Sequence, residues 1–166
     1  GIALGSRVEA IGENFVIASG KKYACDLVVM SVGIRPNAEL ALSAGAELGL
    51  KGVKVNELLQ TSAKGVYAVG DVAEVPNMID AKPVIAGLAN AAYLQGMVAG
   101  QNALGAEKKY FGTSLTFATV IGEIEVASTG FNRQFAESQG IKVAEGRACG
   151  KNKYAWYPGA KELTVK

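Results

Sequence analysis

The residues best suited to hold a ligand follow a short apolar run near the middle of the chain. Residues 66–69 read Val-Tyr-Ala-Val, lie between two glycines, and lead directly into Gly70 and Asp71. This pattern predicts a buried strand. Gly70 has no Cβ, so another molecule can approach its backbone, and the Asp71 carboxylate can accept hydrogen bonds from hydroxyl groups. The run therefore predicts a ligand site at a strand end, and the alternative is an ordinary strand followed by a turn.

A long helix is expected after a loop over residues 74–83. The helix covers residues 84–104 and is rich in alanine, leucine, glutamine and methionine. Its first turns carry small residues, including Gly87 and Ala89, so a flat ring could lie against backbone N–H groups there. The positive end of the helix dipole would favour negative charge on that ring. Close packing of the helix on a sheet is the alternative reason for small residues.

Shorter elements surround this region. Strands are expected over residues 7–11, 15–18, 26–33, 53–55, 124–128, 141–144, 154–157 and 162–165, with a turn over 19–22 and a linker over 105–109. The strand over 26–33 is nearly continuous in apolar residues, as in a parallel sheet covered on both faces. Asn37 is expected to cap a helix over 38–44 that Gly45 ends, and Asn132 to cap one over 133–139.

The composition excludes several classes of function. The 166 residues carry a net charge of +2, with 49% hydrophobic and 19% charged residues, which is typical of an α/β protein. Without a sustained basic run or a long apolar stretch, we expect neither nucleic-acid nor membrane binding. Histidine is absent, and Cys25 and Cys149 lack partners at metal or redox spacing. We therefore expect no metal site and no catalytic residue in this chain, and a packing role for both cysteines.

Two segments resemble the FAD- and NAD(P)-dependent disulfide oxidoreductase family. Thr61, six residues, Ala68, one residue, then Gly70 and Asp71 match its second flavin motif. In that family the aspartate holds a ribitol hydroxyl of FAD. Residues 26–37, which run from Asp-Leu-Val-Val to Gly-Ile-Arg-Pro-Asn, resemble the crossing from the NAD(P)-binding domain back to the FAD-binding domain. The two motifs occur in the family's order.

The helix start adds further residues to the implied cofactor site. Counted back from Gln95 and Gly96, the positions Leu88, Ala89 and Asn90 match the helix start that faces the N1/O2 edge of the isoalloxazine in the resembled family. The resemblance therefore implies FAD binding by Gly70, Asp71, Leu88, Ala89 and Asn90.

The last third resembles the dimerisation domain of one branch of that family. Residues 112–114, 127–130 and 156–160 are similar to the branch that contains NADH oxidases, NADH peroxidases and coenzyme A-disulfide reductases. In the reductases, a tyrosine near such a Tyr-Pro-Gly element reaches the partner subunit's substrate site, which implies a substrate role for Tyr157. The alternative is that Trp156 and Tyr157 are core or interface aromatics.

The resemblance implies partial Rossmann-like α/β domains followed by part of an α+β dimerisation domain. Residues 1–34 would end the NAD(P)-binding domain, 35–108 would form the second half of the FAD-binding domain, and 109–166 would begin the dimerisation domain. The family's Gly-x-Gly-x-x-Gly motif and its redox cysteine are not found in this sequence. We therefore expect a fragment of a longer enzyme.

The implied enzyme passes a hydride from NAD(P)H to FAD and on to oxygen, peroxide or a disulfide. We expect a cytoplasmic homodimer or larger assembly, and a fragment that alone is inactive and retains little FAD. The electron acceptor and the choice between NADH and NADPH stay open. A ferredoxin- or rubredoxin-reductase-type flavoprotein and a non-catalytic interaction module are the alternatives.

Overall fold

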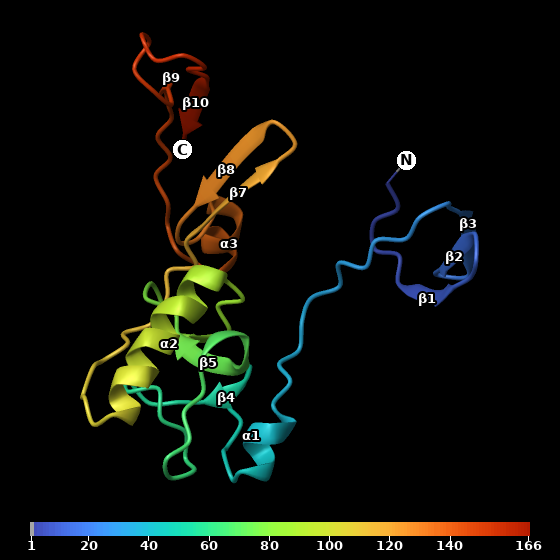
Figure 1. Cartoon of the computed structure of the whole chain (residues 1–166). Helices are drawn as coiled ribbons and strands as arrows, with labels where there is room; N and C mark the ends of the chain where they lie inside the picture. The colour runs from blue at the N-terminus through green and yellow to red at the C-terminus, as the bar shows by residue number, and fades with distance from the viewer. Residues whose placement is uncertain (1) are drawn as a thin grey trace. The chain divides into compact units, whose positions relative to one another are not determined.

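The computed structural model describes residues 2–166, in two units that are treated separately below (Figure 1). The first unit ends at Arg35, and the second runs from Pro36 to Lys166.

The first unit contains a three-stranded antiparallel meander. Its strands are β1 (Val8–Ile11), β2 (Phe15–Ala18) and β3 (Lys21–Ala24), which pair in chain order. The turn between β2 and β3 uses left-handed backbone at Ser19, with φ 50°, and at Gly20, with φ 73°. The expected strands are confirmed, but the turn is shorter than expected because Lys21 and Lys22 already belong to β3.

The expected apolar strand over residues 26–33 does not form. These residues have no strand pairing, and their side chains face solvent, with Leu27 79% and Val29 80% exposed. A strand of a parallel sheet requires a hydrogen-bonded neighbour, and no other described segment pairs with this one. The prediction was wrong because an apolar sequence shows only that the segment has side chains to bury. A strand also requires a neighbouring strand with which its backbone can form hydrogen bonds.

Helix α1 (Glu39–Ser43) opens the second unit. Its N-cap residue is Ala38, which makes no side-chain capping bond, so the expected cap at Asn37 is wrong. Gly45 ends the helix as expected. Its φ is 89°, a conformation open to glycine, and its N–H donates to the Leu42 carbonyl at 2.9 Å.

A three-stranded sheet carries the core of the second unit. Strand β4 (Val53–Lys54) pairs in parallel with β5 (Ala73–Pro76), and β5 pairs antiparallel with β6 (Pro83–Val84). β4 confirms a short strand at this position. The expected loop over 74–83 is too long, because most of β5 lies within it. The residues of the buried core are Ala38, Ala46, Val53, Leu59, Ala68, Ala73, Val75 and Ala99.

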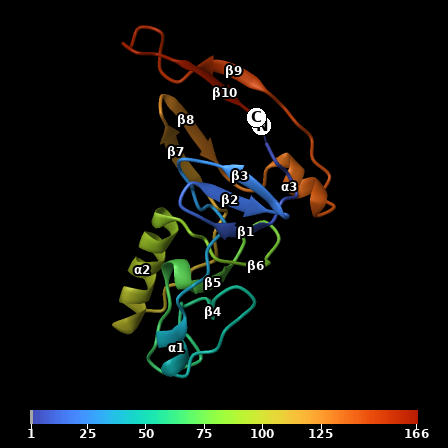
Figure 2. The same cartoon turned by 90° about the vertical axis from the view of Figure 1, so that its right-hand side faces the viewer.

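Helix α2 (Ala89–Ala103) lies alongside β5 in both views (Figures 1 and 2). It begins at Ala89 and not at residue 84 as expected. Val84 instead pairs with Val75, and Gly87 has a left-handed φ of 60°, which a right-handed helix cannot contain. The buried face of α2 consists of Ala91, Gln95, Ala99 and Asn102.

The remaining chain forms two separate hairpins and a short helix. Strands β7 (Phe117–Ile121) and β8 (Ile124–Ser128) pair, helix α3 (Arg133–Ser138) follows, and β9 (Ala148–Lys151) pairs with β10 (Glu162–Val165). The Asn132 side chain accepts a hydrogen bond from the Phe135 N–H at 2.8 Å, which confirms the expected cap. Residues 141–144 and 154–157 are not strands, and the second segment lies in the connection between β9 and β10.

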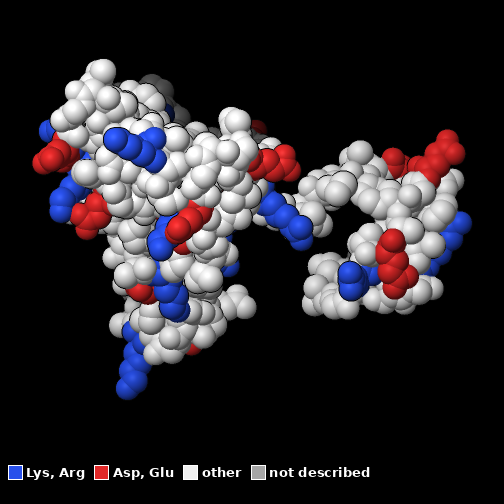
Figure 3. Space-filling view, turned by 90° about the horizontal axis from the view of Figure 1, so that it is seen from below, with Lys and Arg blue, Asp and Glu red and all other residues white. Residues whose placement is uncertain are grey.

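Burial and charge differ along the chain. From residue 114 onward Ala136 is the only buried residue, and Cys149 is exposed, so the packing role expected for that cysteine is wrong. Figure 3 shows cationic and anionic groups interspersed among broad uncharged areas of one face.

Within residues 2–166, no helix combines the length and the apolar character needed to cross a membrane. The same residues contain no cluster of three potential metal ligands.

Candidate functional site

The segment before Gly70 is extended but is not the buried strand that was expected. Tyr67 alone makes a bridge, to Gln60, and only Ala68 of residues 66–69 is buried. The Thr61 hydroxyl donates to the Val66 carbonyl at 2.9 Å and ties the start of the motif to this segment. Because the described chain offers one bridge and no continuous partner strand, the pairing required for a strand is missing.

Gly70 turns the chain at the end of that segment. Val69 is extended, with φ −145° and ψ 162°, whereas Gly70 has φ 71° and begins a 3-10 turn, η1 (Gly70–Val72). The left-handed conformation favours glycine over residues with a Cβ. A Cβ at Gly70 would lie 3.4 Å from the Ala92 Cβ, in the first turn of α2. The motif glycine therefore lets the chain reverse directly against the helix.

A buried hydrogen bond joins Gly70 to the same helix. The Gly70 N–H donates to Oε1 of Gln95 at 2.6 Å, and the Gln95 side chain is fully buried. Sequence reasoning used Gln95 only to align the helix and did not identify this contact. The sequence nevertheless contained a signal for this contact. Gln95 lies at helical spacing from Ala91, Ala99 and Asn102, and a long polar side chain on the buried face of a helix requires a hydrogen-bond partner.

Asp71 follows Gly70 and is exposed to solvent. Its carboxylate has no hydrogen bond or ion pair with another of the described residues 2–166. Its oxygens are therefore available as acceptors for hydroxyl groups of a ligand.

The amino end of α2 lacks a side-chain cap. Leu88 is the N-cap residue, with extended φ −134° and ψ 129°, and its side chain caps nothing. The Asn90 side chain accepts from the Ala91 N–H at 2.8 Å and donates to the Thr116 carbonyl at 3.0 Å. The N–H groups of Ala89 and Asn90 precede the first intrahelical bond, so they can face an anionic or electron-rich group.

The structure thus brings two of the expected elements together. η1 and the amino half of α2 pack against each other through Gly70, Ala92 and Gln95. Leu88, Ala89 and Asn90 lie at the true helix start, although the helix was expected to begin earlier. Within residues 2–166, the arrangement combines the unpaired Asp71 carboxylate, a glycine that leaves room beside the backbone, and the two N–H groups at the helix start that make no hydrogen bond.

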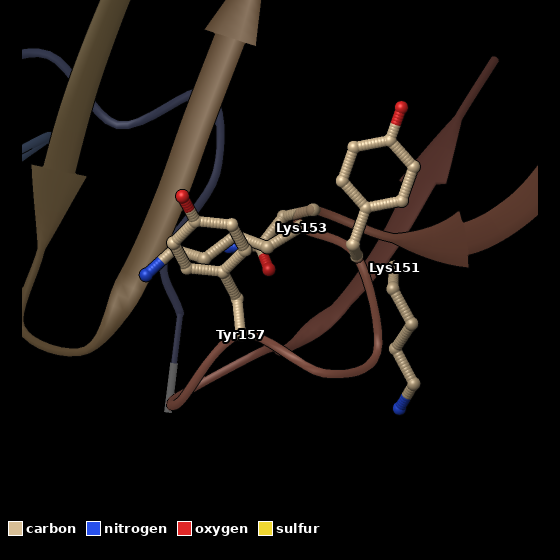
Figure 4. Close-up of a pocket in the computed structure, with 5 residues that line it drawn as sticks. Lys151, Lys153 and Tyr157 are labelled. Atoms are coloured by element: carbon tan, nitrogen blue, oxygen red, sulfur yellow. The ribbon is translucent and has the colours of Figure 1, made fainter.

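Tyr157 lies in the connection between β9 and β10 and is 52% exposed. Its ring centroid is 4.6 Å from that of Trp156, and its N–H donates to the Tyr154 carbonyl at 2.9 Å. Together with Lys151, Asn152, Lys153 and Tyr154 it lines an open cavity of about 550 Å³. Figure 4 shows the Lys151 side chain pointing away from the Tyr157 ring. These contacts of Tyr157 all lie within its own hairpin.

Two side chains with raised pKa values, Lys109 and Arg133, lie outside the Gly70 turn. The hydrogen bond to Glu57, reinforced by its negative charge, raises the pKa of Lys109. Hydrogen bonds to Glu137 and then to Glu145 raise the pKa of Arg133.

Known proteins are similar to this chain in sequence and in fold. A family model described as Pyridine nucleotide-disulphide oxidoreductase matches residues 2–96, a range that includes the Gly70 turn and the start of α2. The NADH oxidase of Methanocaldococcus jannaschii is 38% identical over 151 residues, which cover 91% of this chain and 34% of the relative. The NAD(P)H sulfur oxidoreductase (CoA-dependent) of Pyrococcus furiosus is 38% identical over 152 residues, which also cover 91% of this chain and 34% of the relative.

A solved structure of a NAD-dependent persulfide reductase from A. fulgidus gives a TM-score of 0.82 at 31% identity. The likeness covers 96% of this chain and 30% of that protein. It confirms the expected Rossmann-like α/β class. The chain spans about a third of the length of the curated relatives. Because the family model covers more than half of its residues, the chain belongs to the pyridine nucleotide-disulphide oxidoreductase family.

Proposed function

We propose that this chain provides the second flavin-binding half of an oxidoreductase that passes a hydride from NAD(P)H through FAD to oxygen, peroxide or a disulfide. The observation that carries the proposal is the packing of the Gly70–Asp71 turn against the amino half of α2. The names of the relatives support the reaction class: one is an NADH oxidase and another an NAD(P)H sulfur oxidoreductase.

The polar groups of the turn and the helix start fit FAD. When bound, FAD would accept the hydride, since the redox chemistry belongs to the cofactor. The exposed Asp71 carboxylate would accept hydrogen bonds from ribitol hydroxyls, and Gly70 would leave room for the cofactor beside the backbone. The uncapped N–H groups of Ala89 and Asn90 would stabilise negative charge on the isoalloxazine.

The assembly of the intact protein is a further part of the proposal. The hairpins carry exposed apolar side chains, including Ile121 at 67%, Ile124 at 66% and Trp156 at 75%. We propose that a second copy covers part of this surface and that Tyr157 serves the partner's substrate site. A homodimer in sedimentation equilibrium supports this assembly, and a monomer across the micromolar range contradicts it.

We place the protein in the cytoplasm, where the free thiols of Cys25 and Cys149 would remain reduced.

The 166 residues by themselves are expected to show no turnover and to retain little FAD. The Gly-x-Gly-x-x-Gly motif that cradles the FAD pyrophosphate does not occur in this sequence. Flavin absorbance near one equivalent after purification and dialysis of this chain would contradict the expectation.

The role of Asp71 is tested in the full-length polypeptide that contains residues 1–166. Asp71→Asn keeps the shape of the side chain and removes its charge, and Asp71→Ala removes both acceptors. A hydrogen bond to a charged group contributes ~1.5–3 kcal/mol, so the Kd for FAD should rise about 10- to 100-fold in Asp71→Ala. FAD titration followed by flavin fluorescence measures the change.

Asp80→Asn is the matched control. Asp80 is a second carboxylate of the same unit, but its oxygens already contact Lys82, at 3.1 Å to the backbone nitrogen and 3.5 Å to Nζ. We expect its FAD affinity to equal that of the wild type. An unchanged affinity in Asp71→Ala would remove Asp71 from the site, and a wild-type protein without FAD would contradict the proposed function itself.

A further inference from the structure

Gln95 is a buried amide with a hydrogen bond at only one of its two polar atoms. Its side chain is 0% exposed, and Oε1 accepts the Gly70 N–H at 2.6 Å. Nε2, the nitrogen of the same amide, has no hydrogen-bond partner within residues 2–166. Among the described residues, it is the single buried side-chain nitrogen or oxygen in this condition.

Asn102, on the same face of α2, is an amide with hydrogen bonds at both of its polar atoms. Its Nδ2 donates to the Leu58 carbonyl at 2.9 Å and to the Lys108 carbonyl at 2.8 Å. Its Oδ1 accepts from the Lys108 N–H at 2.8 Å. Asn102 thus ties the end of α2 to two backbone segments, whereas Gln95 has one bond, to the motif glycine.

The two amides differ in what they contribute to stability. A buried donor without a partner is costly, so an apolar side chain of similar length at position 95 would remove one such cost, that of Nε2, and would create another at Gly70. What an apolar side chain cannot supply is an acceptor for the buried Gly70 N–H. That N–H belongs to a residue in left-handed conformation, φ 71°, directly before Asp71. The single bond of Gln95 therefore holds the peptide that sets the direction of the Asp71 carboxylate.

We propose that Gln95 is a positioning residue for the cofactor: it acts through Gly70 and fixes the Gly70–Asp71 turn in the geometry that FAD requires. This inference rests on the proposed function. Gln95 does not itself contact the cofactor, because its side chain is enclosed by protein.

The test uses the full-length polypeptide that contains residues 1–166, with two measurements on each variant. Gln95→Met keeps the side-chain length and removes the acceptor, and Gln95→Glu keeps an acceptor oxygen. For Gln95→Met we expect the Kd for FAD to rise about tenfold, the effect of one lost hydrogen bond. We expect little change in the urea midpoint of the apoprotein, because the loss of the unpaired Nε2 offsets the unpaired Gly70 N–H. Gln95→Glu should keep the FAD affinity of its folded fraction within about threefold.

Asn102→Leu is the matched control at the other end of α2. It leaves three backbone groups without a partner, so the urea midpoint should fall clearly, while the FAD affinity of the folded fraction stays at the wild-type value. A merely structural residue at position 95 would behave in the same way as Asn102.

The outcomes separate the two proposals. If Gln95→Met lowers stability and leaves FAD affinity unchanged, or if Gln95→Glu binds FAD as weakly as Gln95→Met, the positioning role is wrong and the proposed function stands. If the wild-type protein binds no FAD, the proposed function fails before any variant is compared, and the positioning role fails with it.

Discussion

Residues 36–113 and residues 114–166 are held together in different ways. The first region contains all eight residues of the core cluster, in which Val53, Leu59 and Ala73 are 0% exposed. In the second region Ala136 is the one buried residue. Contacts between residues distant in sequence therefore stabilise the first region. The second depends on hairpin pairing, on local polar contacts and on single hydrogen bonds to the first region, such as those from Asn90 to the Thr116 carbonyl and from Lys82 to the Gln139 side chain.

Local contacts are well formed in the second region. β7 and β8 pair along five residues each, the Asn132 cap closes the start of α3, and Arg133 bridges Glu137 at 2.8 Å and Glu145 at 3.1 Å. Two-stranded hairpins are nevertheless marginal in water unless one face is covered. The comparison teaches that correct local structure can exist in this chain without a core, and that such a region requires a covering surface.

The largest effect should come from removing a core side chain. Leu59→Ala deletes a fully buried side chain, so the free energy of unfolding should fall by about 2–5 kcal/mol. Leu163→Ala in β10 is the matched control, because that side chain is 45% exposed, and it should cost about 0.5 kcal/mol or less. Urea unfolding of both variants measures the difference.

Equal costs for Leu59→Ala and Leu163→Ala would break the comparison. That result would mean that β10 is packed in solution, and a dependence of the Leu163→Ala cost on protein concentration would identify a second copy as the covering surface.

An intermediate effect is expected at the cap of α3. Asn132→Ala removes the acceptor for the Phe135 N–H, so α3 should lose about 1 kcal/mol of stability. Faster amide exchange over residues 133–138, with no change in β4 and β5, would show that the second region unfolds independently of the core. Exchange that accelerates equally in both regions would show that they are coupled.

The smallest effect is expected where a surface ion pair lies near the border between the regions. Lys109 Nζ lies 2.7 Å from Glu57 Oε2, both side chains are exposed, and the pair raises the pKa of Lys109 above its ordinary 10.5. A raised pKa on a base stabilises the fold below the unfolded pKa, and this contribution is lost as pH rises through the folded value. In Glu57→Gln, an NMR titration should show the pKa of Lys109 returning toward 10.5. A pKa that stays raised would assign the shift to another group.

Several of the predictions that succeeded depend on neighbouring residues in the sequence. The strand at residues 124–128, the Asn132 cap and the end of α1 at Gly45 were all predicted, because turn and cap chemistry acts within a few residues. The two strands expected over 26–33 and 66–69 did not form. Their apolar pattern was real, but no described segment pairs along their length.

The start of α2 was misplaced for a related reason. Alanine-rich composition favoured a helix from residue 84, but the pairing of Val84 with Val75 and the left-handed Gly87 exclude residues 84–87 from it. Helix propensity is a weak preference that a tertiary contact overrides.

The sequence alone determined which residues are offered as the candidate site: Gly70, Asp71 and the small residues at the start of α2 stand out by type and spacing. Only the tertiary structure decided that the Gly70 turn packs on Ala92 and that Gln95 holds its N–H, since these contacts join residues more than twenty positions apart. Residue type and local spacing specify which groups a segment offers, but hydrogen bonding and burial between distant segments decide which of those groups remain free to bind.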